Sequence, residues 1–127
     1  MGLKVELKPS ERIVIGESVI TNLGTRTTFL VEGGAPILRE KDILTAEMAN
    51  SPVKRIYLCV QMMYLEGNIS KYQDMYFEFI RDLITAVPRF REQIEVISNL
   101  ILEESYYKAL KELKKLQVQE QELLDHV

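Results

Sequence analysis

The segment "ERIVIGESVITNLG", residues 11–24, contains two runs of β-branched residues separated by Gly16-Glu17. Such runs favour strands, and a glycine at the first central position of a two-residue connection supplies the positive φ that a hairpin turn needs. The segment therefore predicts a β-hairpin with strands over residues 12–15 and 18–23. Because a two-stranded ribbon is only marginally stable alone, further elements have to cover its apolar face.

More strands are expected on both sides of this hairpin. In "LKVELK", starting at Leu3, apolar residues alternate with charged ones, which is the period of a strand with one buried face. "RTTFLVE", residues 26–32, predicts another strand that Gly33-Gly34 ends, and residues 36–39 predict a short one. Residues 1–40 are therefore expected to form a small antiparallel β-sheet.

Beyond residue 41 the pattern becomes helical. Ser51 and Pro52 suit the cap and the first position of a helix, and Gly67 is a plausible stop. Strongly polar residues are few between residues 53 and 65, so this helix should be buried on most sides. They are Lys54, Arg55 and Gln61.

Apolar stripes predict three more helices, over residues 70–87, over residues 90–102 and from Ser105 onward. The tail after Val118 loses its stripe, so we expect it to fray or to contact another chain. The predicted fold class is α+β, with a small N-terminal antiparallel β-sheet followed by a C-terminal bundle of about four helices. We expect one domain over residues 1–127, β-rich over residues 1–40 and helical over residues 41–127.

The composition is that of an ordinary globular protein. Of the 127 residues, 46% are hydrophobic and 28% are charged. No stretch approaches the roughly 20 uninterrupted apolar residues of a membrane span, and the N-terminus has no apolar signal core. A single cysteine agrees with a reducing compartment. We therefore expect a cytoplasmic protein that makes no membrane contact.

The residues that usually carry chemistry are sparse. The one histidine, His126, lies next to the C-terminus, where a catalytic or metal-binding role is unusual, and Cys59 lies on the most apolar helix, where a structural thiol is expected. Without a second histidine or a cysteine pair, the usual zinc site is excluded. No nucleophile, base and orienting group come together in the sequence. We predict no enzyme activity, no catalytic residue, no metal ligand and no cofactor.

The charge is unevenly distributed along the chain. Residues 1–60 carry eight Lys or Arg against seven Asp or Glu, whereas residues 61–127 carry eight against twelve, so a polyanion should prefer the N-terminal part. Phe29 is the only aromatic residue before Tyr57, so the sheet offers no platform for base stacking. An RNA would have to be bound by basic side chains, backbone groups and strand edges. The candidates are Lys4, Lys8, Arg12, Arg26, Arg39 and Lys41. Composition alone favours ordinary solvated residues over RNA contacts at these positions.

Several long segments resemble the FlbT family of alphaproteobacterial flagellar systems. The strongest is "PILREKDILTAEMANSPVKRIYLCVQMMY" from Pro36, with "LKVELKPSERIVIGESVITN" before it and "RDLITAVP" and "YYKALKELKKL" after it. This resemblance implies a post-transcriptional regulator that associates with the 5′ untranslated leader of flagellin mRNA and changes its translation or lifetime. It also implies a relation, in opposition or in concert, with the small flagellar protein FlaF.

A second resemblance is local. "GESVITNLG" followed by "APILREKDI" is similar to the carbon storage regulator family of RNA-binding proteins, in which two chains interlace their strands and an arginine contacts a GGA element. The position that matches this arginine is Arg39. The chain departs from the pattern at Pro9-Ser10 and adds a long helical part.

Together these observations predict a sheet that binds RNA and helices that supply a core and a self-association surface. A single chain offers the apolar helix over residues 53–65 few partners, so we expect a homodimer or higher oligomer. The residues expected at its interface are Ile56, Val60, Met63 and Tyr64. The alternative is a protein adaptor that holds FlaF-like partners and leaves RNA contact to another component.

Overall fold

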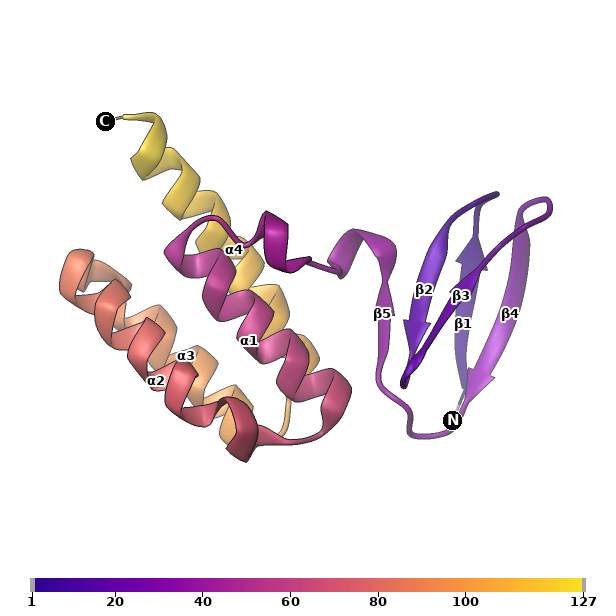
Figure 1. Ribbon diagram of the computed structural model, residues 1–127, viewed down its shortest axis with the longest axis horizontal. Coiled ribbons are helices and arrows are strands. Elements are labelled where there is room, and N and C mark those ends of the chain that lie inside the picture. The colour runs from indigo at the N-terminus through magenta and orange to yellow at the C-terminus, as the bar shows by residue number, and fades with distance from the viewer. Residues whose placement is uncertain (1, 127) are drawn as a thin grey trace. The chain divides into compact units, whose positions relative to one another are not determined.

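The computed structural model describes residues 2–126 and consists of two compact units, Met1–Ile43 and Leu44–Val127 (Figure 1). The first unit contains all the described strands, and the second contains four α-helices. The order of strands followed by helices confirms the predicted α+β fold class.

All the predicted strands are present, although they pair differently from the single sheet expected. β1 pairs with β4 in one antiparallel sheet, and β3, β2 and β5 form another in that order. The predicted third strand ends at Thr21 rather than at residue 23. The strands are β1 Gly2–Leu7, β2 Arg12–Ile15, β3 Ser18–Thr21, β4 Thr27–Glu32 and β5 Ile37–Arg39.

The hairpin between β2 and β3 has the predicted two-residue turn. Ile15 pairs with Ser18, and Gly16 has a φ of 62° while the φ of Glu17 is not positive. This combination is the one that a type II′ turn requires, and it matches the twist of the flanking strands. A residue with a Cβ at position 16 would be strained.

The two small sheets bury their apolar faces in one cluster. Val5 and Leu7 of β1 are buried together with Ile13 of β2, and side chains of the other strands pack around them. Each sheet alone is too small to shield its apolar face, so the two faces cover each other. The partly buried members are Ile15, Phe29, Val31 and Ile37.

The side chain of Asn22 connects three segments of this unit. Its Nδ2 donates to the carbonyl oxygens of Leu7 and Thr25, at 3.1 and 2.9 Å, and its Oδ1 accepts from the backbone N–H of Gly24 at 3.0 Å. The amide thus joins the end of β1 to the turn that leads into β4.

Helix α1, Pro52–Glu66, begins and ends where the sequence predicts. The Ser51 side chain accepts from the backbone N–H of Lys54, and Gly67 ends the helix in the left-handed conformation with a φ of 68°. The other helices are α2 Ile69–Ala86, α3 Arg91–Leu102 and α4 Tyr106–Asp125. Ser105 precedes α4 as predicted, but its side chain makes no capping hydrogen bond.

Helix α1 packs against both α2 and α4, and α3 packs against α4 (Figure 1). Gln61 of α1 is buried and holds the chain before the helix: its Oε1 accepts from the Leu44 N–H at 2.8 Å, and its Nε2 donates to the Leu44 carbonyl at 2.9 Å. The prediction that α1 is buried on most sides is confirmed.

The prediction that the last helix frays after Val118 is wrong. Helix α4 continues to Asp125, and Glu120 is 7% exposed. Its carboxylate accepts from the Ser51 hydroxyl at 2.5 Å and from the Val53 backbone N–H at 3.0 Å. A carboxylate at a helix N-terminus satisfies free N–H groups and interacts favourably with the helix dipole. The end of α4 is therefore fixed by a polar contact rather than by an apolar stripe.

Cys59 is enclosed on α1. Its thiol donates to the Tyr72 carbonyl at 3.4 Å, and burial raises its pKa to about 11. A thiol in this environment stays protonated at neutral pH, which makes it a poor nucleophile.

Replacing Glu120 with alanine should lower the free energy of unfolding of the helical unit by about 2–3 kcal/mol, because the Ser51 hydroxyl and the Val53 N–H lose a charged acceptor. Urea unfolding followed by helical circular dichroism measures this. The exposed neighbour Glu122→Ala serves as the control and should change stability by less than about 0.5 kcal/mol. Equal effects of the two substitutions would contradict the capping role.

Cys59 should resist thiol reagents in the folded protein. Raising its pKa from 9.0 to about 11 makes the thiolate fraction at pH 7.5 about 100-fold smaller than that of an unperturbed thiol, and burial blocks access as well. Absorbance at 412 nm after addition of a disulfide reagent reports the reaction. We expect full labelling in 6 M guanidinium chloride and slow labelling in buffer. Complete labelling of the native protein within minutes would refute the buried environment.

Candidate functional site

The six basic residues predicted to bind RNA all lie in the sheet unit. Lys4 is on β1, Arg12 begins β2 and Arg39 ends β5. The other three are exposed: Lys8 and Arg26 lie in connections between strands, and Lys41 lies in the 3-10 turn Glu40–Asp42 that follows β5.

Two of the arginines are engaged with glutamates. Arg26 Nη1 lies 2.9 Å from Glu6 Oε1, and Arg12 Nε lies 3.2 Å from Glu40 Oε1. The Arg12 backbone N–H also donates to Glu40 Oε2 at 3.3 Å. Across residues 1–43, six basic side chains face six acidic ones, so this unit has no net side-chain charge. The overall field of this unit therefore neither attracts nor repels a polyanion, whereas residues 44–127, with ten basic and thirteen acidic side chains, have an acidic excess.

Three of the candidates keep an uncompensated charge. Lys4, Lys8 and Arg39 make no ion pair with any other residue of the described part of the chain. Arg39 is half-buried and lies opposite Ile13 in the register of β2 and β5. Since β5 is an outer strand of its sheet, Arg39 combines a fixed backbone with a guanidinium that no carboxylate neutralises. Such a group can donate to a phosphate or to a base edge.

The residues predicted for self-association occupy a different environment from the one expected. Ile56, Val60 and Met63 are 0%, 0% and 1% exposed, because α2 and α4 cover the helix that carries them. They belong to the core of their own chain and do not form an exposed surface for a second copy. Tyr64 is half-buried, and its ring centroid lies 6.1 Å from that of Tyr106.

Side chains suited to metal binding do not gather in the described part of the chain. His126 is exposed, Cys59 is enclosed, and residues 2–126 contain no group of three His, Cys, Asp or Glu that could hold a metal ion. Among the same residues, none of the helices has the length and apolar character needed to cross a membrane.

One polar cluster shows shifted pKa values on the surface. The Tyr72 hydroxyl and the Lys71 ammonium, the latter at 3.1 Å, both donate to the Glu66 carboxylate. These hydrogen bonds, that of Tyr72 first, lower the pKa of Glu66, and the bond to Glu66 raises the pKa of Lys71. The cluster joins the end of α1 to the start of α2 on the surface, where the Lys71 side chain is 57% exposed and that of Glu66 is 35% exposed, which fits a structural contact.

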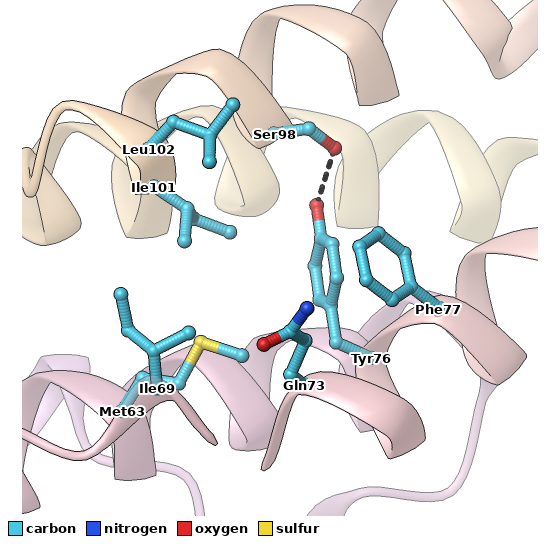
Figure 2. A pocket seen from close by; sticks show the side chains of 8 residues that line it. All are labelled: Met63, Ile69, Gln73, Tyr76, Phe77, Ser98, Ile101 and Leu102. Atoms are coloured by element: carbon cyan, nitrogen blue, oxygen red, sulfur yellow. Dashed lines mark hydrogen bonds between the residues drawn. The ribbon is translucent and has the colours of Figure 1, made fainter. Parts of the chain in front are cut away.

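The helical unit also contains an apolar pocket of about 150 Å³ (Figure 2). The Tyr76 hydroxyl is hydrogen-bonded to Ser98 Oγ at 2.8 Å, and burial raises the pKa of this tyrosine. No charged side chain lines the pocket, so it has the character of a socket for a small apolar group. Its lining consists of Met63, Ile69, Gln73, Tyr76, Phe77, Ser98, Ile101 and Leu102.

A row of lysines on α4 is absent from the sequence-based candidates. Lys108, Lys111 and Lys115 are all exposed and follow one another at helical spacing, and Tyr107 lies beside them. These lysines lie in "YYKALKELKKL", the segment that also carries an apolar stripe and part of the resemblance to the FlbT family. The low total charge of the C-terminal half concealed a local excess of positive charge.

The chain matches the family model described as "Flagellar protein FlbT" over residues 3–124. A relative from Rhodopseudomonas palustris (strain TIE-1), named "Probable flagellum biosynthesis repressor protein FlbT", is 69% identical over 98% of both chains. A Bradyrhizobium diazoefficiens relative named "Probable flagellum biosynthesis repressor protein FlbT 1" is 50% identical, over 97% of this chain and 85% of its own.

The "Flagellum biosynthesis repressor protein FlbT" of Caulobacter vibrioides (strain ATCC 19089 / CIP 103742 / CB 15) is 34% identical, over 100% of this chain and 92% of its own. No solved structure gives a significant match. Since the family model and these relatives cover nearly the whole sequence, the chain belongs to the FlbT family of flagellar proteins.

Proposed function

We propose that this protein regulates flagellin expression after transcription, by binding the 5′ untranslated leader of flagellin mRNA and altering its translation or stability. The observation that carries the regulatory part is the match, at 69% identity over 98% of both chains, to a relative named a probable flagellum biosynthesis repressor.

The sheet unit provides the candidate surface for recognition of the leader. Phe29, the only aromatic side chain among residues 1–43, is half-buried against the apolar cluster, so the unit has no exposed set of rings for stacking. Recognition would therefore depend on polar groups: the outer backbone edge of β3 and the uncompensated cations Lys4, Lys8 and Arg39. Because these cations are few, background binding should be weak and its salt dependence shallow.

Arg39 is the first candidate for a base contact. Unlike Arg12 and Arg26, it is not held by a glutamate, and its backbone is fixed by pairing with Ile13. Placing a guanidinium on a rigid strand reduces the conformational entropy lost on binding. A good bidentate contact from arginine to a guanine contributes about 1–3 kcal/mol of discrimination.

Self-association is part of the proposal, through a surface other than the enclosed face of α1. β3 is an outer strand, all four of its residues are exposed, and Val19 and Ile20 are apolar. Soluble proteins usually protect such an edge with lysine, proline or a bulge, whereas Ser18–Thr21 contains no lysine or proline. Antiparallel pairing of two β3 strands would place two copies of Arg39 on one particle.

The second candidate function is a protein adaptor for a FlaF-like partner. The observation that favours it is the apolar pocket of Figure 2, beside which Phe77 and Leu102 are 49% and 80% exposed. Exposed apolar side chains around a socket are common at protein interfaces. In this case RNA would be contacted by another component.

Purified protein should bind a flagellin leader more tightly than a scrambled leader of the same composition. Arg39→Ala should reduce affinity for the leader by roughly 5- to 150-fold, as expected for the loss of a bidentate base contact, and should affect the scrambled RNA less. Electrophoretic shift titrations at a fixed salt concentration measure both. Arg81→Ala, on an exposed position of α2, is the control and should bind like the original protein. Equal affinity for both RNAs would instead favour the adaptor.

The pairing of β3 predicts that light scattering coupled to size exclusion gives twice the mass of one chain, or a higher multiple. Val19→Lys should shift the protein toward the monomer, because two lysines would meet across the paired strands. Leu23→Lys places the same charge on a 94% exposed turn residue outside the strand and should leave the mass unchanged. A monomeric mass for the original protein at micromolar concentration would contradict self-association.

A further inference from the structure

The densest positive charge of the described residues lies on helix α4. Residues 106–118 contain four lysines and a single glutamate, Glu112. The whole helical unit, in contrast, has ten basic and thirteen acidic side chains, and the sheet unit is balanced. The lysines of α4 thus form a local positive region on an otherwise acidic unit.

These lysines lie on one face of the helix. Lys108, Lys111 and Lys115 are exposed, whereas the opposite face is buried in the helical unit. The spacing of three and four residues places successive ammonium groups about one helical turn apart, so the row extends over about 10 Å. The buried face consists of Ala109, Leu110, Leu113, Leu116 and Glu120.

An aromatic ring accompanies the lysines on the same face. Tyr107 is 41% exposed, and Lys111 Nζ lies 5.0 Å from the centroid of its ring. Lys115 Nζ is 3.1 Å from Glu112 Oε1, with 70% of the lysine side chain exposed. Exposed surface ion pairs of this kind are weak, so a phosphate can replace the carboxylate at little cost. The face therefore combines cations with a ring on which a base can stack.

We propose that the face formed by Tyr107, Lys108, Lys111 and Lys115, here called the α4 basic face, binds single-stranded RNA. The three ammonium groups contact backbone phosphates, and the tyrosine ring stacks on a base. This inference rests on the proposed function and deepens it, because it assigns the sequence-independent part of binding to the helical unit. Arg39 keeps the role of recognising the sequence.

An RNA fits this face better than an acidic protein or a membrane. An acidic protein would need only the lysines, whereas an exposed tyrosine beside a cation is typical of surfaces that hold single-stranded nucleic acid. A membrane-bound helix would carry a row of large apolar residues next to its lysines. The corresponding row here contains only Val118 in addition to the ring.

The test uses the full chain with all three lysines replaced, Lys108→Gln, Lys111→Gln and Lys115→Gln. Affinity for the flagellin leader and for an unrelated single-stranded RNA should fall by the same factor, at least 10-fold at low salt. The slope of log affinity against log salt should decrease by about 2, since each lost phosphate contact on a single strand removes about 0.7. The control makes the same charge change at other helix positions, Lys54→Gln with Arg55→Gln and Arg81→Gln. It should keep most of the affinity for both RNAs and most of the salt slope.

The tyrosine separates stacking from simple charge attraction. Tyr107→Ala should weaken binding of both RNAs by roughly 5- to 150-fold, and Tyr107→Phe should keep nearly all of it. Because all these side chains are exposed, circular dichroism and thermal melting should show that every variant is folded. A base stacked on Tyr107 should also quench the fluorescence of this tyrosine. Tyr107→Phe removes the fluorophore but keeps the ring, so the decrease in tyrosine fluorescence on RNA binding should be smaller in this variant than in the original protein.

The outcomes distinguish this inference from the proposed function. Unchanged affinity and salt slope in the triple lysine variant would overturn the α4 basic face and leave leader recognition intact. Failure of the original protein to prefer the leader, together with loss of binding to both RNAs in the variant, would reject the proposed function and support the face. Poly-glutamate that displaced RNA as efficiently as unlabelled RNA of equal charge would reject RNA in favour of an acidic protein partner.

Discussion

The buried carboxylate of Glu120 is the contact that fixes how the last helix lies in the helical unit. A carboxylate is costly to bury unless donors surround it, and here the donors are the Ser51 hydroxyl and the Val53 N–H at the start of α1. Only one rotation of α4 about its axis meets both this requirement and the burial of its leucines. The same rotation turns Lys108, Lys111 and Lys115 toward solvent, so the core determines which face of α4 a partner meets.

The sheet unit uses its polar groups differently, since it is too small to bury them. Glu6 and Glu40 remain on the surface and neutralise Arg26 and Arg12, while the Asn22 amide holds the connections between strands. The consequence is a unit with a well-defined backbone, an exposed outer strand β3 and almost no net charge. Such a surface can make selective contacts with an RNA but does not attract it strongly from a distance, because long-range attraction requires an excess of charge.

The sequence was informative where a structure depends on neighbours along the chain. Gly16, the Ser51-Pro52 pair and Gly67 act within a few residues, and the predicted hairpin and α1 boundaries were confirmed. It failed where the partner is distant: Glu120 lies 69 residues from Ser51, and the cover of α1 comes from helices that follow it. Because the sequence does not show that α2 and α4 cover α1, its apolar residues Ile56, Val60 and Met63 were predicted to form an interface with a second chain. The lysines of α4 are evident in the sequence, but the count of basic and acidic residues over residues 61–127 gives an acidic excess that conceals them.

Two surfaces of unlike charge offer a way for a protein of net charge −3 to bind a polyanion selectively. Contacts to phosphates supply affinity and depend steeply on salt, whereas contacts to base edges supply discrimination and depend on salt very little. If the lysines of α4 provide the first and Arg39 the second, added salt weakens binding of every RNA while the ratio between leader and unrelated RNA stays nearly constant. If the preference for the leader came instead from additional phosphate contacts, it would fall as salt is added, so the salt dependence of that ratio reports whether base contacts supply the discrimination.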